Sequence, residues 1–282
     1  LKRLGIPTVP RAKIDLGVEV SRLERERIDE MAGRVEGAPV NVEACKRLAV
    51  FYLEGGKAER AVGYFKRVLE VNPGDVEAWI GLGRAYIELG KRKEAVEYLE
   101  KAIEHNPDSE EAWFFLGLAY LKAGDHEQAV KCYDQVLRLN PRNHAAWLNR
   151  GCALIRMGRV EEALRCFNRA VKLSPEEHLM WHNKGIALAM LGRYREAVEC
   201  HKKAVRLNPR NPGAWYRLGL ALFALGRYEE AVGCFRKAVE LREGWYPDAL
   251  QCMGLALLSL GRAKEAEGPC REAVPPNPNP QD

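Results

Sequence analysis

Histidine and cysteine are the residues of this chain that could bind a metal ion or act as nucleophiles, and their spacing is regular. Four cysteines follow one another at intervals of 34 residues: Cys132, Cys166, Cys200 and Cys234. His178 and His182 are four residues apart, a spacing that places both imidazoles on one face of a helix. Zinc needs a third or fourth ligand, and the sequence has none at ligand spacing. C-x-x-C, H-E-x-x-H, G-x-S-x-G, P-loop and dinucleotide motifs are absent from it. The sequence therefore predicts no metal, no cofactor and no enzymatic activity.

The same interval of 34 residues recurs through most of the chain. One unit contains Trp79, Leu82, Gly83, Tyr86, Gly90, Ala95, Leu99, Ala102 and Pro107. The next contains Trp113, Leu116, Gly117, Tyr120, Gly124, Ala129, Tyr133, Val136 and Pro141, and units led by Trp147, Trp181 and Trp215 continue the pattern. These residues match W-x2-L-G-x2-Y followed by A-x3-F and a closing Pro, so the chain resembles tetratricopeptide repeat (TPR) proteins from about residue 42 to 280.

The resemblance implies an all-α fold, an α-solenoid superhelix of about seven antiparallel helix pairs with the first helices lining the concave side. The expected units are residues 42–75, 76–109, 110–143, 144–177, 178–211, 212–245 and a degenerate unit at 247–280. The recurring glycines of the first helices, such as Gly117, leave room for the second helices, and Gly124 can end a first helix in the left-handed conformation. Asp75, Ser109 and Asn143 are placed to cap the next first helix.

The two ends depart from this pattern. Residues 1–41 form an N-terminal segment, in which an apolar stripe predicts a helix from Leu16 to Val35 that covers the first unit. Gly268 and Pro269 fall inside the last second helix, where an interior Pro costs about 3 kcal/mol, so we expect this helix to be weak. The prolines and polar residues of 275–282 predict a disordered tail.

The function implied by the resemblance is that of a protein–protein interaction scaffold that binds a peptide or helix in its concave groove. By family analogy, the ligand-facing side chains stand at the second, fifth, sixth, ninth, twelfth and thirteenth positions of each unit. The candidate binding residues are Phe114, Phe115, Leu118, Asn149, His182, Asn183, Tyr216, Arg217 and Phe223. Some aliphatic members can be buried against the neighbouring unit, whereas we expect Phe114, His182 and Tyr216 to be exposed.

Two groove chemistries of the family can be compared with these residues. Asn183 and Arg217 occupy two of the five places of the carboxylate clamp of TPR co-chaperones, but Leu148, Cys152 and Gly213 occupy the others. No clamp for a terminal carboxylate is therefore expected. The asparagine ladder of O-linked N-acetylglucosamine transferase is matched only by Asn149 and Asn183, which predicts at most a short ladder.

The distribution of charge along the chain leaves open a further function, the binding of nucleic acid or of an acidic partner. Residues 144–245 hold 18 Lys or Arg against 10 Asp or Glu, whereas residues 42–143 hold 15 against 17. The excess of basic residues lies mainly in turns and second helices, which favours a solvated outer surface over binding of nucleic acid or an acidic partner.

A second alternative function is that of the targeting region of a larger enzyme such as a glycosyltransferase. No apolar stretch is long enough to span a bilayer, so we expect no membrane insertion and a cytoplasmic protein.

Four regularly spaced cysteines are explained by the repeat. Equivalent positions of stacked units are separated by about 8–10 Å, one helix-packing distance. A disulfide needs Cα atoms about 4.4–6.8 Å apart. We therefore interpret these cysteines as small, partly buried packing residues.

Overall fold

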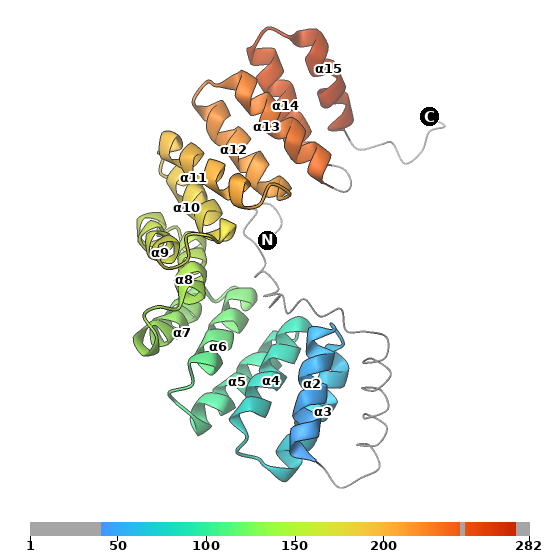
Figure 1. Ribbon diagram of the computed structural model, residues 1–282, viewed down its shortest axis with the longest axis vertical. Coiled ribbons are helices and arrows are strands. Elements are labelled where there is room, and N and C mark those ends of the chain that lie inside the picture. Colours follow the sequence, from blue (N-terminus) through green and yellow to red (C-terminus); the bar gives the residue numbers. More distant parts are fainter. Residues whose placement is uncertain (1–40, 243–245, 275–282) are drawn as a thin grey trace, which may run out of the picture. The chain divides into compact units, whose positions relative to one another are not determined.

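A computed structural model describes residues 41–242 and 246–274, and these residues form helices joined by short turns, with no strand among them (Figure 1). The all-α fold class expected from the sequence is confirmed. The helix predicted for residues 16–35, with its role as a cap, and the disorder predicted for 275–282 lie outside the described residues.

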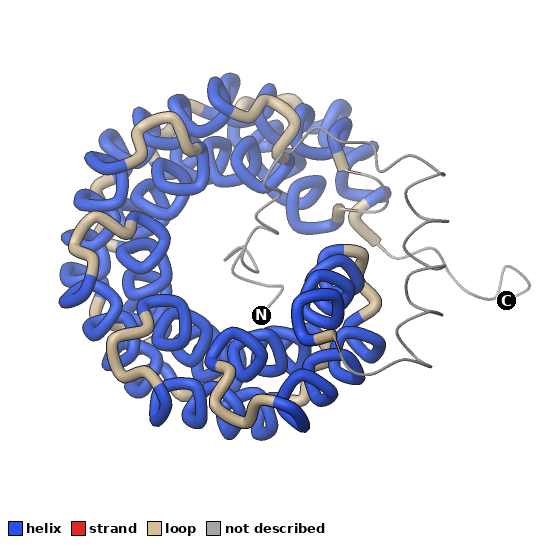
Figure 2. Tube along the Cα trace, turned by 60° about the horizontal axis from the view of Figure 1, so that its bottom comes forward, coloured by secondary structure: helices blue, strands red, loops and turns tan. Residues whose placement is uncertain are grey.

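The chain divides into two compact units, and the division falls between Ala153 and Leu154 inside one helix. The N-terminal unit contains α2 (Val42–Glu54), α3 (Ala58–Val71), α4 (Val76–Glu88), α5 (Arg92–His105), α6 (Glu110–Ala123), α7 (His126–Leu139) and most of α8 (His144–Arg156). The C-terminal unit contains α9 (Val160–Leu173), α10 (His178–Met190), α11 (Tyr194–Leu207), α12 (Pro212–Ala224), α13 (Tyr228–Leu241), α14 (Pro247–Ser259) and α15 (Ala263–Glu272). In each unit the even-numbered first helices form one row and the odd-numbered second helices form another (Figure 2).

Helix boundaries follow from local chemistry. The side chains of Asp75 and Ser109 accept hydrogen bonds from backbone N–H groups three residues on, at 2.9 and 3.2 Å, and so cap α4 and α6. Asn143 caps α8 in the same way at 2.8 Å. Gly124 follows α6 with φ of 91°, the left-handed conformation that a residue with a Cβ adopts only at a cost. The sequence predicted these caps and this turn correctly.

The two helices of a pair meet at a glycine of the first helix. A Cβ added to Gly83 would lie 2.3 Å from Cγ of Leu99, and one added to Gly219 would lie 2.6 Å from Cε1 of Phe235. Carbon atoms in contact are normally about 3.5–4.0 Å apart, so a side chain at either position would collide with the second helix. The missing Cβ lets Leu99 and Phe235, both fully buried, pack directly on helix backbone.

Tryptophan and proline of the repeat are coupled by a hydrogen bond between successive pairs. In the N-terminal unit, the indole Nε1 of Trp79 donates to the carbonyl oxygen of Pro73 at 2.8 Å, and Trp113 donates to Pro107 at 2.8 Å. In the C-terminal unit, Trp215 donates to Pro209 at 2.8 Å. Each Trp therefore fixes the first turn of its helix to the loop that ends the preceding pair.

The last pair is less regular, as the sequence predicts. α15 spans 10 residues, whereas the other second helices span 14, and it contains Pro269. Of its residues only Ala266 is buried. The shortened helix therefore contributes little to the hydrophobic core.

Candidate partner-binding surface

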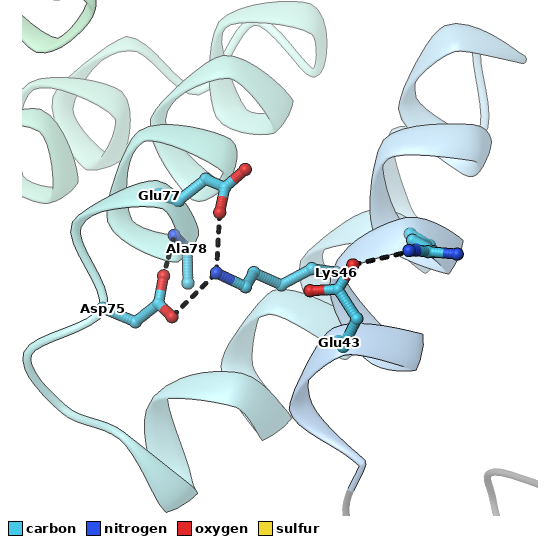
Figure 3. A network of polar contacts seen from close by, with 6 residues as sticks. Glu43, Lys46, Asp75, Glu77 and Ala78 are labelled. Atoms are coloured by element: carbon cyan, nitrogen blue, oxygen red, sulfur yellow. Dashed lines mark hydrogen bonds and ion pairs between the residues drawn. The ribbon is translucent and has the colours of Figure 1, made fainter.

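In each unit, we call the exposed side of the row of first helices the first-helix face. In α2 and α4 of the N-terminal unit this face is charged and its charges are already paired. Nζ of Lys46 lies 3.0 Å from a carboxylate oxygen of Asp75 and 2.6 Å from one of Glu77 (Figure 3). A hydrogen bond from Lys46 to Glu77 is the largest cause of the raised pKa of this lysine. Lys46 therefore ties α2 to the cap of α4 and has little capacity left for a partner.

Aromatic side chains replace charges further along the N-terminal unit. Phe114 and Phe115 of α6 are half-buried, with ring centroids 5.6 Å apart. The ring of Phe114 also packs on the buried Tyr133 of α7, at 5.9 Å. The guanidinium of Arg84 lies 4.8 Å from the centroid of Phe115 and 3.6 Å from a carboxylate oxygen of Glu111. The partly exposed rings of Phe114 and Phe115 are thus held in place by Tyr133 of α7 and Arg84 of α4.

Four of the predicted binding residues are buried. Leu118 and Asn149 in the N-terminal unit are 6% and 7% exposed, and His182 and Asn183 in the C-terminal unit are 4% and 3% exposed. Asn183 uses its side-chain amide to donate to the carbonyl oxygen of Leu179, 2.9 Å away. The expectation that His182 is exposed is wrong, because its imidazole packs inward against His201 of α11, with ring centroids 5.6 Å apart. In this conformation these four side chains offer almost no surface to a partner.

The other predicted residues of the C-terminal unit are partly exposed. Tyr216 of α12 packs against Phe235 and Tyr246, with centroid distances of 5.9 and 5.4 Å. Burial of its ring, followed by the nearby Cys252, raises the pKa of Tyr216. Arg217 and Phe223 are also half-buried. These three side chains combine a fixed position with some accessible surface.

The structure adds three apolar residues that sequence reasoning missed. Met190, Leu255 and Leu258 are 51%, 48% and 49% exposed, and all three belong to first helices of the C-terminal unit. Each stands at a ligand-facing position of its unit, so the same positional rule would have found them had it been applied to every unit. Together with Phe223 they form what we call the apolar strip, on α10, α12 and α14.

Comparison with known proteins identifies the family. The model of the family described as the cilia and flagella-associated protein 70 C-terminal domain, a TPR domain, matches residues 19–178 and again residues 111–282. The chain belongs to this TPR family. No curated protein sequence was found to match it.

Solved TPR structures share the fold of this TPR chain. The Cut9–Hcn1 complex of the anaphase-promoting complex gives a TM-score of 0.67 at 19% identity over 90% of this chain and 50% of that one. PilF of Pseudomonas aeruginosa gives 0.62 at 23% identity, over 69% and 88%. YrrB, whose structure is described as a TPR protein with an unusual peptide-binding site, gives 0.55 at 22% identity, over 66% and 95%. At these identities the likeness concerns the fold.

Basic residues of the TPR turns are neutralised by neighbouring carboxylates. Nε and Nη2 of Arg193 donate to the two carboxylate oxygens of Glu196, both at 2.7 Å. Arg227 makes the same two-pronged contact with Glu230, at 2.6 and 2.8 Å. The hydrogen bonds from these arginines are the largest cause of the lowered pKa of each glutamate. The positive charge of these turns is therefore balanced within the helix that follows.

The cysteines and histidines singled out by spacing are packing residues. Cys132, Cys200 and Cys234 are free and buried, and burial raises the pKa of their thiols to about 12, 11 and 11. Nε2 of His178 lies 3.2 Å from Nδ2 of Asn208, whereas the ring of His182 contacts His201. Within residues 41–242 and 246–274, no group of three or more His, Cys, Asp or Glu side chains is arranged to hold a metal ion. In the same part of the chain, every helix is too short or too polar to span a bilayer.

Proposed function

We propose that this TPR chain is a non-enzymatic scaffold that binds a helix or extended segment of another protein on its first-helix face. The observation that carries the proposal is the apolar strip of the C-terminal unit, where Met190, Leu255 and Leu258 each leave about half of the side chain in contact with water. Large apolar side chains that are exposed as a group favour burial against a partner.

The chemistry of the strip defines the segment that would fit it. Ligand-facing positions of α10 and α12 carry Met190 and Phe223 with Ala189 and Ala224 beside them, and none of these is charged. Apolar anchors of an amphipathic helix, spaced at i, i+3 or i+4 and i+7, match such a surface. The half-buried Arg217, on the same helix as Phe223, can donate hydrogen bonds to a carboxylate or a backbone carbonyl of the bound segment. YrrB, a TPR protein with an unusual peptide-binding site, supports this use of the fold.

Binding of nucleic acid is less well supported. Nucleic-acid affinity depends on Lys and Arg side chains that can contact phosphate groups. Arg193 and Arg227, which stand in the turns of the basic region, each have a carboxylate at hydrogen-bond distance. Such an arginine can contact a phosphate only by giving up its carboxylate, which weakens this alternative.

A selection experiment tests the proposal. A phage-displayed library of 12- to 16-residue peptides is selected against the chain, and the affinity of the enriched peptides is measured by fluorescence anisotropy for three variants. Met190→Ser and Leu258→Ser remove apolar surface from the strip. Val71→Ser is the matched control, because Val71 is 53% exposed on the second helix α3. We expect the first two changes to weaken binding and the third to leave it unchanged. Equal effects of all three, or peptides that compete with DNA, would refute the proposal.

A further inference from the structure

Two histidines face each other in the interior of the helix pair α10–α11. His182 of α10 and His201 of α11 are 4% and 1% exposed, and their ring centroids lie 5.6 Å apart at an interplanar angle of 61°. The ring of His201 also covers Gly185, where an added Cβ would lie 2.5 Å from Cε1 and 2.7 Å from Nε2 of the imidazole. Two titratable side chains therefore occupy a closely packed part of the core.

At the position of His201, the pairs α2–α3, α4–α5, α6–α7, α8–α9 and α12–α13 carry an aliphatic or aromatic residue that does not become positively charged. The residues equivalent to His201 at intervals of 34 are Phe65, Leu99, Tyr133, Phe167 and Phe235. In the pair α12–α13, Tyr216 and Phe235 make the corresponding contact, with centroids 5.9 Å apart. A ring pair at these positions thus also occurs in α6–α7, where Phe114 faces Tyr133, and in α12–α13. Among the pairs from α2–α3 to α12–α13, α10–α11 is the one with an imidazole at both positions, and imidazole is a basic group that can become positively charged.

Among the described residues, the groups that act on the charge of His201 are basic. α11 packs against α10 and α12, and the titratable or charged groups that act on His201 from these helices are His182 and Arg217. Burial is the largest cause of the strongly lowered pKa of His201, followed by His182 and then Arg217. Within the described part of the chain, Nδ1 of His201 has no hydrogen-bond partner. A proton on this ring would therefore be buried beside another basic group and a guanidinium, without a counter-ion.

We propose that the His182–His201 pair makes the helix pair α10–α11 acid-sensitive, so that proton uptake by His201 loosens α10 from α11 and disables the first-helix face around Met190. The effect on binding rests on the function proposed above. The effect on the stability of α10–α11 does not, because it follows from the packing of the two rings alone.

The sign and size of the effect follow from proton linkage. A histidine has a pKa of about 6.5 in an unfolded chain. Because the pKa of His201 is lowered in the folded chain, the unfolded state binds more protons, and stability falls as the pH decreases below about 6.5. If the folded ring stays neutral down to pH 5, a change from pH 7 to pH 5 shifts the unfolding equilibrium of this pair about 25-fold toward the open state. Substitution by Phe, the residue of α13 at this place, removes this factor.

Hydrogen exchange at pH 7 and pH 5, corrected for the intrinsic exchange rate, measures the effect locally. In the wild-type chain we expect the protection of residues 178–207 to fall about 25-fold more than in His201→Phe. Protection of residues 212–241 should change equally in both proteins. Identical pH dependence of residues 178–207 in the two proteins would overturn the proposal. So would a wild-type chain in which acid reduces protection in 212–241 before 178–207.

A converse variant keeps the test independent of one substitution. Phe235→His places an imidazole at the equivalent buried position beside Tyr216, and we expect it to confer acid sensitivity on residues 212–241. If Phe235→His does not fold, the comparison of wild type with His201→Phe still decides the question.

Binding of a library-selected peptide is then measured at pH 7 and pH 5.5 for wild type and His201→Phe. A loss of affinity at pH 5.5 in wild type alone supports regulation of the face. If no peptide binds the first-helix face at either pH, the proposed function fails while the exchange experiment still decides the acid sensitivity.

Discussion

Gly219 provides the sharpest test of the packing that defines this array. A Cβ at Gly219 would lie 2.6, 2.8 and 3.0 Å from three atoms of the Phe235 ring. Contact between carbon atoms requires about 3.5 Å, so Gly219→Ala forces α12 and the ring of Phe235 apart by about 1 Å. Phe235 is fully buried, as are Ala231 and Ala238 on the same helix, so the ring has little freedom to turn away.

The size of the effect is the difference between two terms. Overpacking of a core by one methyl group costs about 1–3 kcal/mol. Replacement of Gly by Ala inside a helix contributes about 1 kcal/mol in the opposite direction. We expect Gly219→Ala to lower the free energy of unfolding by about 0–2 kcal/mol.

Gly233 is a matched control in the same helix pair. It lies in α13, and nothing is within 4 Å of a Cβ added to it. Gly233→Ala should therefore raise stability by about 0.5–1 kcal/mol through helix propensity alone. Urea unfolding followed by circular dichroism measures both changes. If Gly219→Ala is as stable as Gly233→Ala, the proposed contact between α12 and α13 is wrong.

Two further predictions concern the interior. Tyr133→Phe should raise the free energy of unfolding by about 1 kcal/mol, because the fully buried hydroxyl has no hydrogen-bond partner among the described residues. Equivalent positions hold Phe65 and Phe167, so a phenyl ring fits this place in the repeat. A loss of about 1 kcal/mol or more in urea unfolding would show that the hydroxyl is hydrogen-bonded. EDTA and dithiothreitol should leave the thermal unfolding curve unchanged, because Cys132, Cys200 and Cys234 are free and no metal-ligand group is found among the described residues; a lower midpoint with either reagent would contradict this interpretation.

Much of the fold could be predicted because the repeat makes each local signal recur. Gly124 and Asn143 act in the turn and cap that their residue types favour. The prediction that glycines of the first helices leave room for the second helices agrees with the structure, where Gly219 faces Phe235. These features depend on backbone conformation and residue size, which the sequence specifies directly.

Exposure on the first-helix face could not be predicted from residue position. In α6 and α10 the fifth residue packs against a ring of the second helix, as Phe114 does against Tyr133 and His182 against His201. Phe114 remains half-buried, whereas the smaller His182 is almost fully buried. Which of these residues a partner can reach therefore depends on the size of the side chain and on the residue it faces, which is His201 in α11 and the larger Tyr133 in α7. Position within the repeat alone carries no such information.

The measurement that tests the scaffold interpretation most directly is the affinity of a selected peptide for two double variants. One replaces Tyr216 and Phe223 of α12 with Ala, and the other replaces Lys202 and Lys203 of α11 with Ala. Aromatic anchors can supply most of the affinity of an interface, so the α12 pair should weaken binding by about 1–4 kcal/mol. The α11 pair should change the affinity little, and circular dichroism should show the same helix content for both. If the lysine pair abolishes binding and the aromatic pair does not, the first-helix face is not the binding surface and the basic second helices are.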